Sequence, residues 1–182
     1  MAYSLQDFCR DTRDILKTGD ASRPVIEKIR VRMEQIIADP AFVTEYFGAG
    51  QVPGIKKIYT DPQLGFEVMT YRYEQAQRSQ PHDHGASWAV YGQVRAHTDM
   101  TEWERTDDGS SRDRAQLKVK REYRLNPGQA GVYFVRELHS TATAEGSCYL
   151  RITGTDLEMI ERLRIDPATG KVDRIHSRQL TG

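Results

Sequence analysis

The chain has 182 residues with 26 basic and 26 acidic side chains, so its formal net charge at pH 7 is zero. This balance excludes the basic surface of a nucleic-acid-binding protein. The longest apolar stretches, such as 130–135, are far shorter than the ~20 residues of a membrane-spanning helix, and the charged start has no signal-peptide core. The composition predicts one domain over 1–182 in the cytoplasm, where both cysteines stay reduced.

The first fifty residues have helical periodicity. Apolar residues at i, i+3, i+4 and i+7 spacing predict a helix over 5–16, and Ser4 with Asp7 resembles a capping box at its start. A second helix is expected over 22–39, ending before a proline, and a short turn of helix over 42–47. Each of these helices has an apolar face that must pack against another part of the fold.

From residue 55 onward the apolar period changes to two, which is typical of half-buried strands. Strands are expected over 55–60, 66–73, 87–98, 101–105, 117–125, 131–135, 148–153 and 171–176. Proline- and glycine-containing turn signals separate them, and the stretch 106–114, which carries both charge signs, is expected to be a solvated hairpin loop. Many short antiparallel strands without intervening helices predict an all-β sandwich or barrel.

The segment Pro-His-Asp-His-Gly at 81–85 is the most informative chemically. His82 and His84 are two residues apart in an extended segment, so both side chains project to one side and can reach one metal ion. His139, expected just after the strand over 131–135, could complete a set of three imidazoles. The alternative is that these are surface histidines on loops.

These residues carry a family resemblance. The two histidines, the Pro-Gly-x-x-Gly turn at 127–131 and His139 resemble the two split motifs of the cupin superfamily. The helical start, the Tyr-Thr pair at 59–60 and the segment at 81–84 resemble the cysteine dioxygenase-type branch of thiol dioxygenases. The resemblance implies an all-β fold, the double-stranded β-helix or cupin jelly roll, over 51–182. It places the helices of 1–50 outside the barrel.

The resemblance also implies a metal and a reaction. It assigns His82, His84 and His139 as ligands of Fe(II), although zinc, nickel or manganese would also suit three imidazoles. Many cupins add a glutamate four or five residues after the histidine pair, where this chain has Trp88 and Ala89. The implied activity is that of a mononuclear non-haem dioxygenase, whose partners are O₂ and a small-molecule substrate.

Several residues depart from the branch. Its Tyr-Thr-Arg run, in which arginine pairs with the substrate carboxylate, reads Tyr-Thr-Asp here and ends at Asp61, so free cysteine is not the expected substrate. Its Ser-x-His-x-Tyr run has Tyr149, Arg151 and Thr153 in the matching places, so the tyrosine that handles protons is missing. The cysteine that cross-links to that tyrosine in some members is replaced by Ala89.

Three residues are the candidate catalytic or substrate-contacting side chains: Arg151, Tyr59 and Tyr71. Arg151 could clamp a substrate carboxylate if it faces the pocket, but strand alternation equally allows it to point to solvent. Tyr71 either lines the pocket or packs in an ordinary core. Asp83 could hold an imidazole N–H, or it could be a turn-capping aspartate.

The sequence is compatible with two functions. The first is a thiol dioxygenase-like enzyme with altered substrate contacts. The second is a metal-binding cupin without oxygenase activity, which would be a small-molecule binder or sensor, or a hydrolase or isomerase with another divalent metal. The loss of the tyrosine and arginine contacts favours the second. Neither function involves nucleic acid or a membrane, and pairing of exposed edge strands could form a homodimer.

Overall fold

The structure, a computed structural model, describes residues 2–175. Its helical elements are α1 (Leu5–Leu16), α2 (Arg23–Ile37), α3 (Pro40–Phe47) and the short 3₁₀ turn η1 (Leu157–Met159). Its strands are β1 (Gly54–Thr60), β2 (Glu67–Arg72), β3 (Gln77–Arg78), β4 (Ala89–Arg95), β5 (Thr98–Arg105), β6 (Leu117–Leu125), β7 (Ala130–Tyr133), β8 (Leu138–Thr143), β9 (Cys148–Thr153), β10 (Arg162–Ile165) and β11 (Val172–Ile175). None of the helices in this range is long and apolar enough to cross a membrane.

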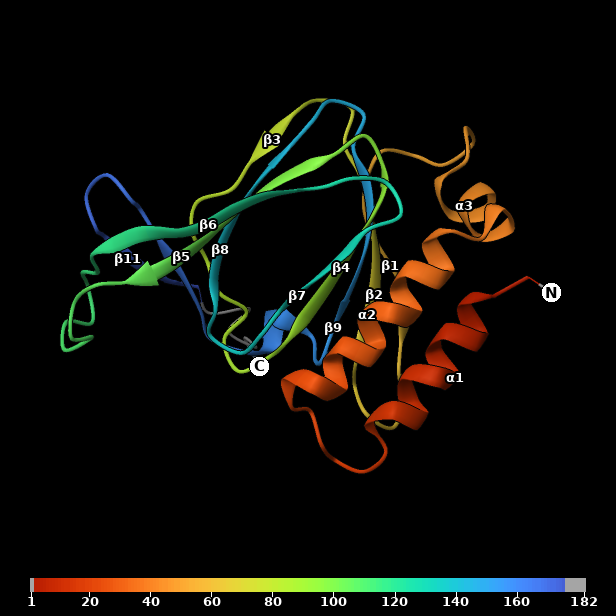
Figure 1. The fold of residues 1–182 in the computed structure, drawn as a ribbon, viewed down its shortest axis with the longest axis horizontal. Coiled ribbons are helices and arrows are strands. Elements are labelled where there is room, and N and C mark those ends of the chain that lie inside the picture. Colours follow the sequence, from red (N-terminus) through yellow and green to blue (C-terminus); the bar gives the residue numbers. More distant parts are fainter. Residues whose placement is uncertain (1, 176–182) are drawn as a thin grey trace, which may run out of the picture.

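Two antiparallel sheets form the barrel (Figure 1). One has the strand order β1-β2-β9-β4-β7 and the other β3-β8-β5-β6, while β10 and β11 form a separate hairpin. Side chains of both sheets meet in one interior cluster, whose members are Tyr71, Ala89, Tyr91, Met100, Leu125, Tyr133 and Tyr149. The predicted all-β jelly roll is therefore confirmed.

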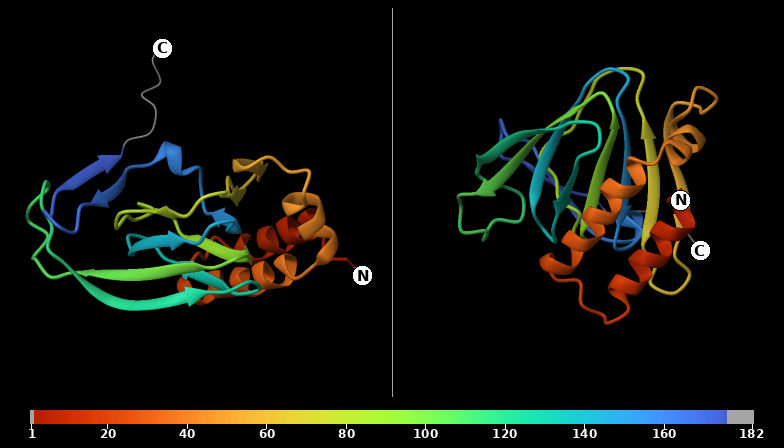
Figure 2. Two further views of the ribbon diagram at one scale, coloured as in Figure 1. Left: turned by 90° about the horizontal axis from the view of Figure 1, so that it is seen from above. Right: turned by 45° about the vertical axis from the view of Figure 1, so that its right-hand side comes forward.

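The helices pack on the outer face of the five-stranded sheet (Figure 2), as predicted. The Ser4 side chain accepts the backbone N–H of Asp7, which completes the expected capping box of α1. α2 crosses β4 closely because Gly92 has no side chain: a Cβ there would lie 2.6 Å from Cγ of Met33. Buried side chains from both layers form what we call the helix-side core. Its members from β2, β4 and β9 and from the residues directly before β2 and β4 are Phe66, Val68, Trp88, Val90, Cys148, Leu150 and Ile152.

Three strands were not predicted: β3, β8 and β10. The largest error concerns His139, which lies within β8 and not after the preceding strand. β8 reads Leu-His-Ser-Thr-Ala-Thr, so it lacks the alternation of apolar and polar residues that marks a strand. The strand predicted over 171–176 is β11, and its last residue lies outside the described range.

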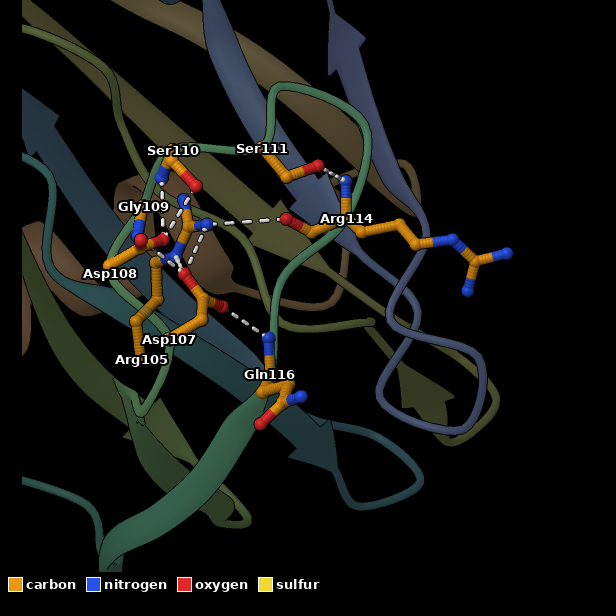
Figure 3. Close-up of polar contacts among 8 residues, drawn as sticks. All are labelled: Arg105, Asp107, Asp108, Gly109, Ser110, Ser111, Arg114 and Gln116. Atoms are coloured by element: carbon orange, nitrogen blue, oxygen red, sulfur yellow. Dashed lines mark hydrogen bonds and ion pairs between the residues drawn. The ribbon is translucent and has the colours of Figure 1, made fainter.

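The loop between β5 and β6 is the predicted hairpin loop, and most of its residues are exposed. Asp107 organises it (Figure 3): one carboxylate oxygen accepts the Gly109 N–H at 2.8 Å and the Nε–H of Arg105 at 3.0 Å. The other oxygen accepts the backbone N–H of Gln116. These bonds give the loop a defined shape outside the barrel.

Candidate metal centre

Three histidines converge inside the barrel. His82 and His84 lie just before β4 and His139 lies on β8, and one ring nitrogen from each is within 4.8 Å of the others. The backbones of His82 and His139 exchange both hydrogen bonds, at 2.9 and 3.0 Å, so they form a narrow antiparallel bridge. This bridge explains how residues distant in sequence come together.

The segment that carries His82 and His84 is held by its neighbours. Gly85 has φ +59°, and a Cβ there would lie 2.2 Å from the carbonyl oxygen of residue 161, so glycine is required. One Asp83 oxygen accepts the backbone N–H of Gly85 at 3.1 Å and that of Leu163 at 2.7 Å. Asp83 therefore anchors the histidine segment to β10 and does not hold an imidazole.

The hydrogen bonding of the imidazole nitrogens is consistent with metal ligation. His82 donates its Nδ1–H to the carbonyl of Gln80 at 2.9 Å, which leaves the lone pair on Nε2 available. Nδ1 of His84 and both ring nitrogens of His139 are buried and have no hydrogen-bond partner among the described residues. Unpaired buried nitrogens cost free energy, so these residues fit a bound divalent metal well.

Burial also sets the protonation of the imidazoles. Loss of solvent lowers the pKa of His84 and of His139 well below 6.5, and the neighbouring histidines lower it further. Both rings are therefore neutral at pH 7. Neutral imidazole is the form that coordinates a metal.

Arg151 faces the barrel interior, so the solvent-facing alternative is wrong. Its Nη2 lies 2.9 Å from Sδ of Met69, and its guanidinium carbon lies 4.9 Å from the Tyr71 ring centroid. Its Nε is buried without a hydrogen-bond partner in residues 2–175. Tyr71 lines the same interior and stacks on Tyr149, with ring centroids 4.5 Å apart. Arg151 also pairs across the sheet with Tyr91, whose hydroxyl lies 3.1 Å from Nε2 of His84, so Arg151 and the adjacent Tyr71 lie on the histidine side of the interior.

Tyr59 is placed elsewhere. Its hydroxyl lies 2.8 Å from the Arg13 guanidinium and donates to Asp61 at 3.1 Å, in the contact between α1 and β1. Asp61 is buried there and also accepts the backbone N–H groups of Gln63 and Leu64. The structure does not bring Tyr59 to the histidines. Since Asp61 also lies outside the interior, its identity gives no information about the substrate.

Three residues near the histidines were not predicted from the sequence. The Tyr91 hydroxyl lies 3.1 Å from Nε2 of His84, and the Tyr133 ring centroid lies 4.3 Å from that of His139. Alternation along β4 could have indicated Tyr91, because it is two residues after the buried Ala89. The third is Arg162 on β10, a strand without a recognisable sequence pattern.

Two cavities open next to the histidines on different sides. One, of about 420 Å³, is lined by His139 and Tyr133 together with Glu102 and Arg136. The other, of about 370 Å³, is lined by His82 and by the arginines 78, 162 and 164. Small molecules can therefore approach His139 from one cavity and His82 from the other, and the second cavity is cationic, with three arginines and one aspartate, Asp83.

No protein-family model and no curated protein matches this sequence. Solved structures similar to it include the DMSP lyase DddQ from Ruegeria pomeroyi, at 13% identity over 63% of this chain and 52% of that chain, with a TM-score of 0.44. A cupin superfamily protein from Desulfitobacterium hafniense aligns at 11% identity over 58% and 84% of the two chains, with a TM-score of 0.41. Hydroquinone 1,2-dioxygenase PnpCD aligns at 14% identity over 57% and 66%, with a TM-score of 0.41. Similarity at these identities and TM-scores does not identify a metal or a reaction. The metal, the reaction and the cysteine dioxygenase branch are therefore predictions from the sequence.

Proposed function

We propose that the chain is a metal-dependent oxidoreductase that oxidises a small anionic molecule with O₂. His82, His84 and His139 would hold the metal, with Fe(II) as the working ion. The observation that carries the proposal is the convergence of three largely buried imidazoles, with unpaired ring nitrogens, beside a buried guanidinium. A bound ferrous ion would supply a site that activates O₂ and binds an anionic group of the substrate.

The chain's own residues would bind and orient the substrate. Arg151 presents a fixed, planar guanidinium that can hold a carboxylate bidentately. The rings of Tyr71 and Tyr149 would line the interior beside Arg151 and restrict the access of water to the substrate. The Tyr91 hydroxyl, 3.1 Å from His84, is placed to orient that imidazole or to hold a proton close to it.

The proposal is tested by O₂ uptake with the iron-loaded protein. A panel of small thiols and diketones, each with and without a carboxylate, is offered to protein containing one iron per chain. We expect O₂ consumption with carboxylate-bearing compounds and a loss of at least tenfold in Arg151→Gln. Zinc-loaded protein is the control, because zinc cannot change its oxidation state.

The same three imidazoles also suit zinc, nickel or manganese, because the donor set holds no group that selects iron. The second candidate is therefore a metal-binding protein without oxygenase activity. If one iron per chain is bound and none of the panel is oxidised, the oxygenase proposal fails and this second candidate replaces it.

A further inference from the structure

Arg162 lies directly across from the metal-ligand segment. His82 forms an antiparallel bridge with Arg164, and Asp83 donates its N–H to the carbonyl of Leu163 at 3.0 Å. The same register, continued by one residue, sets Arg162 opposite His84. Because side chains alternate along a strand, Arg162 and Arg164 share the side of the two histidines. Leu163 packs on the other side, against a separate apolar cluster.

Among the residues that the structure describes, no carboxylate forms an ion pair with the side chain of Arg162. It lines the 370 Å³ cavity with His82, and its Nε is buried without a hydrogen-bond partner among residues 2–175. Burial, and then the charge of Arg151, lower the pKa of Arg162. The charges of Glu158 and Asp156 also act on Arg162, but Glu158 is exposed to solvent, Asp156 pairs with Lys57, and neither forms an ion pair with Arg162 within residues 2–175.

Within residues 2–175, each buried carboxylate has partners other than Arg162, although Asp83 lines the same cavity as this arginine. Asp61 pairs with Arg13, Glu67 with Lys57, and Asp83 with two backbone N–H groups. Glu102 lines the other cavity, and no ion pair joins it to Arg151 or Arg162 within residues 2–175. Arg151 pairs across the sheet with Tyr91, whose hydroxyl lies 3.1 Å from Nε2 of His84, and Arg162 faces His84 from β10. The two guanidinium groups therefore flank the same imidazole, and no ion pair joins either of them to a carboxylate within residues 2–175, which is costly unless an anion from solution binds them.

We propose that Arg151 and Arg162 together bind a small dicarboxylate, with one carboxylate on each guanidinium and the chain between them facing the three histidines. Arg151 would hold the inner carboxylate, inside the barrel, and Arg162 the outer one, at the mouth of the cationic cavity. The position of this ligand beside a metal rests on the proposed function. Its binding needs neither O₂ nor turnover.

The test compares matched acids by isothermal titration calorimetry on the zinc-loaded chain, so that no oxidation takes place. Malonate, succinate and glutarate are each measured against the monocarboxylate of the same carbon number. We expect at least one dicarboxylate to bind tenfold or more tightly than its partner. Arg162→Gln should remove this preference and leave monocarboxylate affinity within about twofold, whereas Arg151→Gln should weaken both acids.

Arg164→Gln is the matched control. Arg164 lines the same cavity, but it is exposed and already pairs with Asp173 at 3.3 Å. The preference for two carboxylates should survive this change, and thermal unfolding establishes that each variant is folded.

Three results would overturn the proposal. The first is equal affinity for the mono- and dicarboxylates, and the second is an equal loss of the dicarboxylate preference in the Arg162 and Arg164 variants. The third is binding of inorganic phosphate as tightly as the best dicarboxylate, which would indicate one compact anion site. Failure of O₂ uptake leaves the dicarboxylate site intact, and failure of the affinity comparison leaves the metal centre intact. The two proposals therefore fail separately.

Discussion

The two faces of β9 show how differently one strand can be used. Towards the helices it presents Leu150 and Ile152, which are fully buried among apolar neighbours. Towards the interior it presents Tyr149, which belongs to the interior cluster, and Arg151, whose guanidinium lies over the Tyr71 ring. Side chains on both faces are largely buried, but on the interior face Nε of Arg151 has no hydrogen-bond partner within residues 2–175.

This difference separates stability from function. Apolar burial on the helix side stabilises the fold by roughly 25 cal/mol for each Å² removed from water. On the interior side, unpaired imidazole and guanidinium nitrogens oppose folding until a ligand joins them. We therefore expect substitutions on the helix side to change the free energy of unfolding, and substitutions on the interior side to change ligand binding.

Leu150→Ala should have the largest effect on stability. Its side chain is fully buried, and the resulting cavity should lower the free energy of unfolding by about 3 kcal/mol. Urea denaturation measures the change, with Tyr149→Phe on the other face as the control. Normal metal and anion binding by the folded fraction is expected, and loss of both would show that the two faces are not separable.

Asp61→Asn should have the next largest effect, because it leaves Arg13 without its carboxylate. Burial opposes ionisation, but the Leu64 N–H and Arg13 outweigh it and lower the pKa of Asp61. The stabilisation by ionised Asp61 is therefore complete above its pKa in the unfolded chain, near 3.8, and is lost as the pH falls through its lower pKa in the folded protein. We expect a loss of about 2 kcal/mol at pH 7.

That loss should shrink below pH 4 when urea denaturation is repeated across a pH series. Asp14→Asn is the control, since this exposed residue pairs with Lys17 only at the surface, where a pair is worth little. A pH-independent difference for Asp61→Asn would contradict the assigned ion pair.

Arg151→Met tests the interior face. Replacing a buried charge with an apolar side chain of similar length should leave the free energy of unfolding unchanged or slightly raised. Affinity for carboxylates should fall at least tenfold, about 1.4 kcal/mol. Calorimetry and urea denaturation on the same variant give both values. A destabilisation as large as that of Leu150→Ala would mean that Arg151 is a structural residue.

Tyr91→Phe should have the smallest effect. It removes one hydroxyl that lies 3.1 Å from His84, a contact worth about 1 kcal/mol. Zinc affinity, measured by competition with a chelator, should fall by less than tenfold, and stability should stay within about 1 kcal/mol. Tyr73→Phe is the control, because the Tyr73 ring packs against Tyr71 and Tyr149, and within the described part of the chain its hydroxyl forms no hydrogen bond with the three histidines. An unchanged affinity in Tyr91→Phe would show that this hydroxyl does not support the site.

Much of the fold was predictable because local patterns and tertiary structure agree. The helical stripes and the capping box of Ser4 lie where the sequence predicts them, and the spacing of His82 and His84 correctly placed them on one side. The sequence could not reveal β8, because its side chains are mixed and half-buried. Likewise, alternation shows which residues share a face, but it does not show which face is the interior, so Arg151 was left undecided.

β10 was missed for another reason. Its place beside the histidines depends on backbone bonds to Asp83 and on the space that Gly85 leaves, and neither is visible in a local pattern. Tyr59 was wrongly assigned to the site because the family motif gives the position of the tyrosine in the sequence but not the direction of its side chain. Here that tyrosine faces α1.

The most direct test of the central claim is the metal content and ligand set of the purified chain. Elemental analysis combined with X-ray absorption spectroscopy should find one divalent metal per chain with three imidazole nitrogens at about 2.0–2.1 Å. In His139→Ala, the content should fall at least tenfold while circular dichroism shows an intact barrel. Full metal content in that variant, or a bound metal without imidazole ligands, would contradict the account.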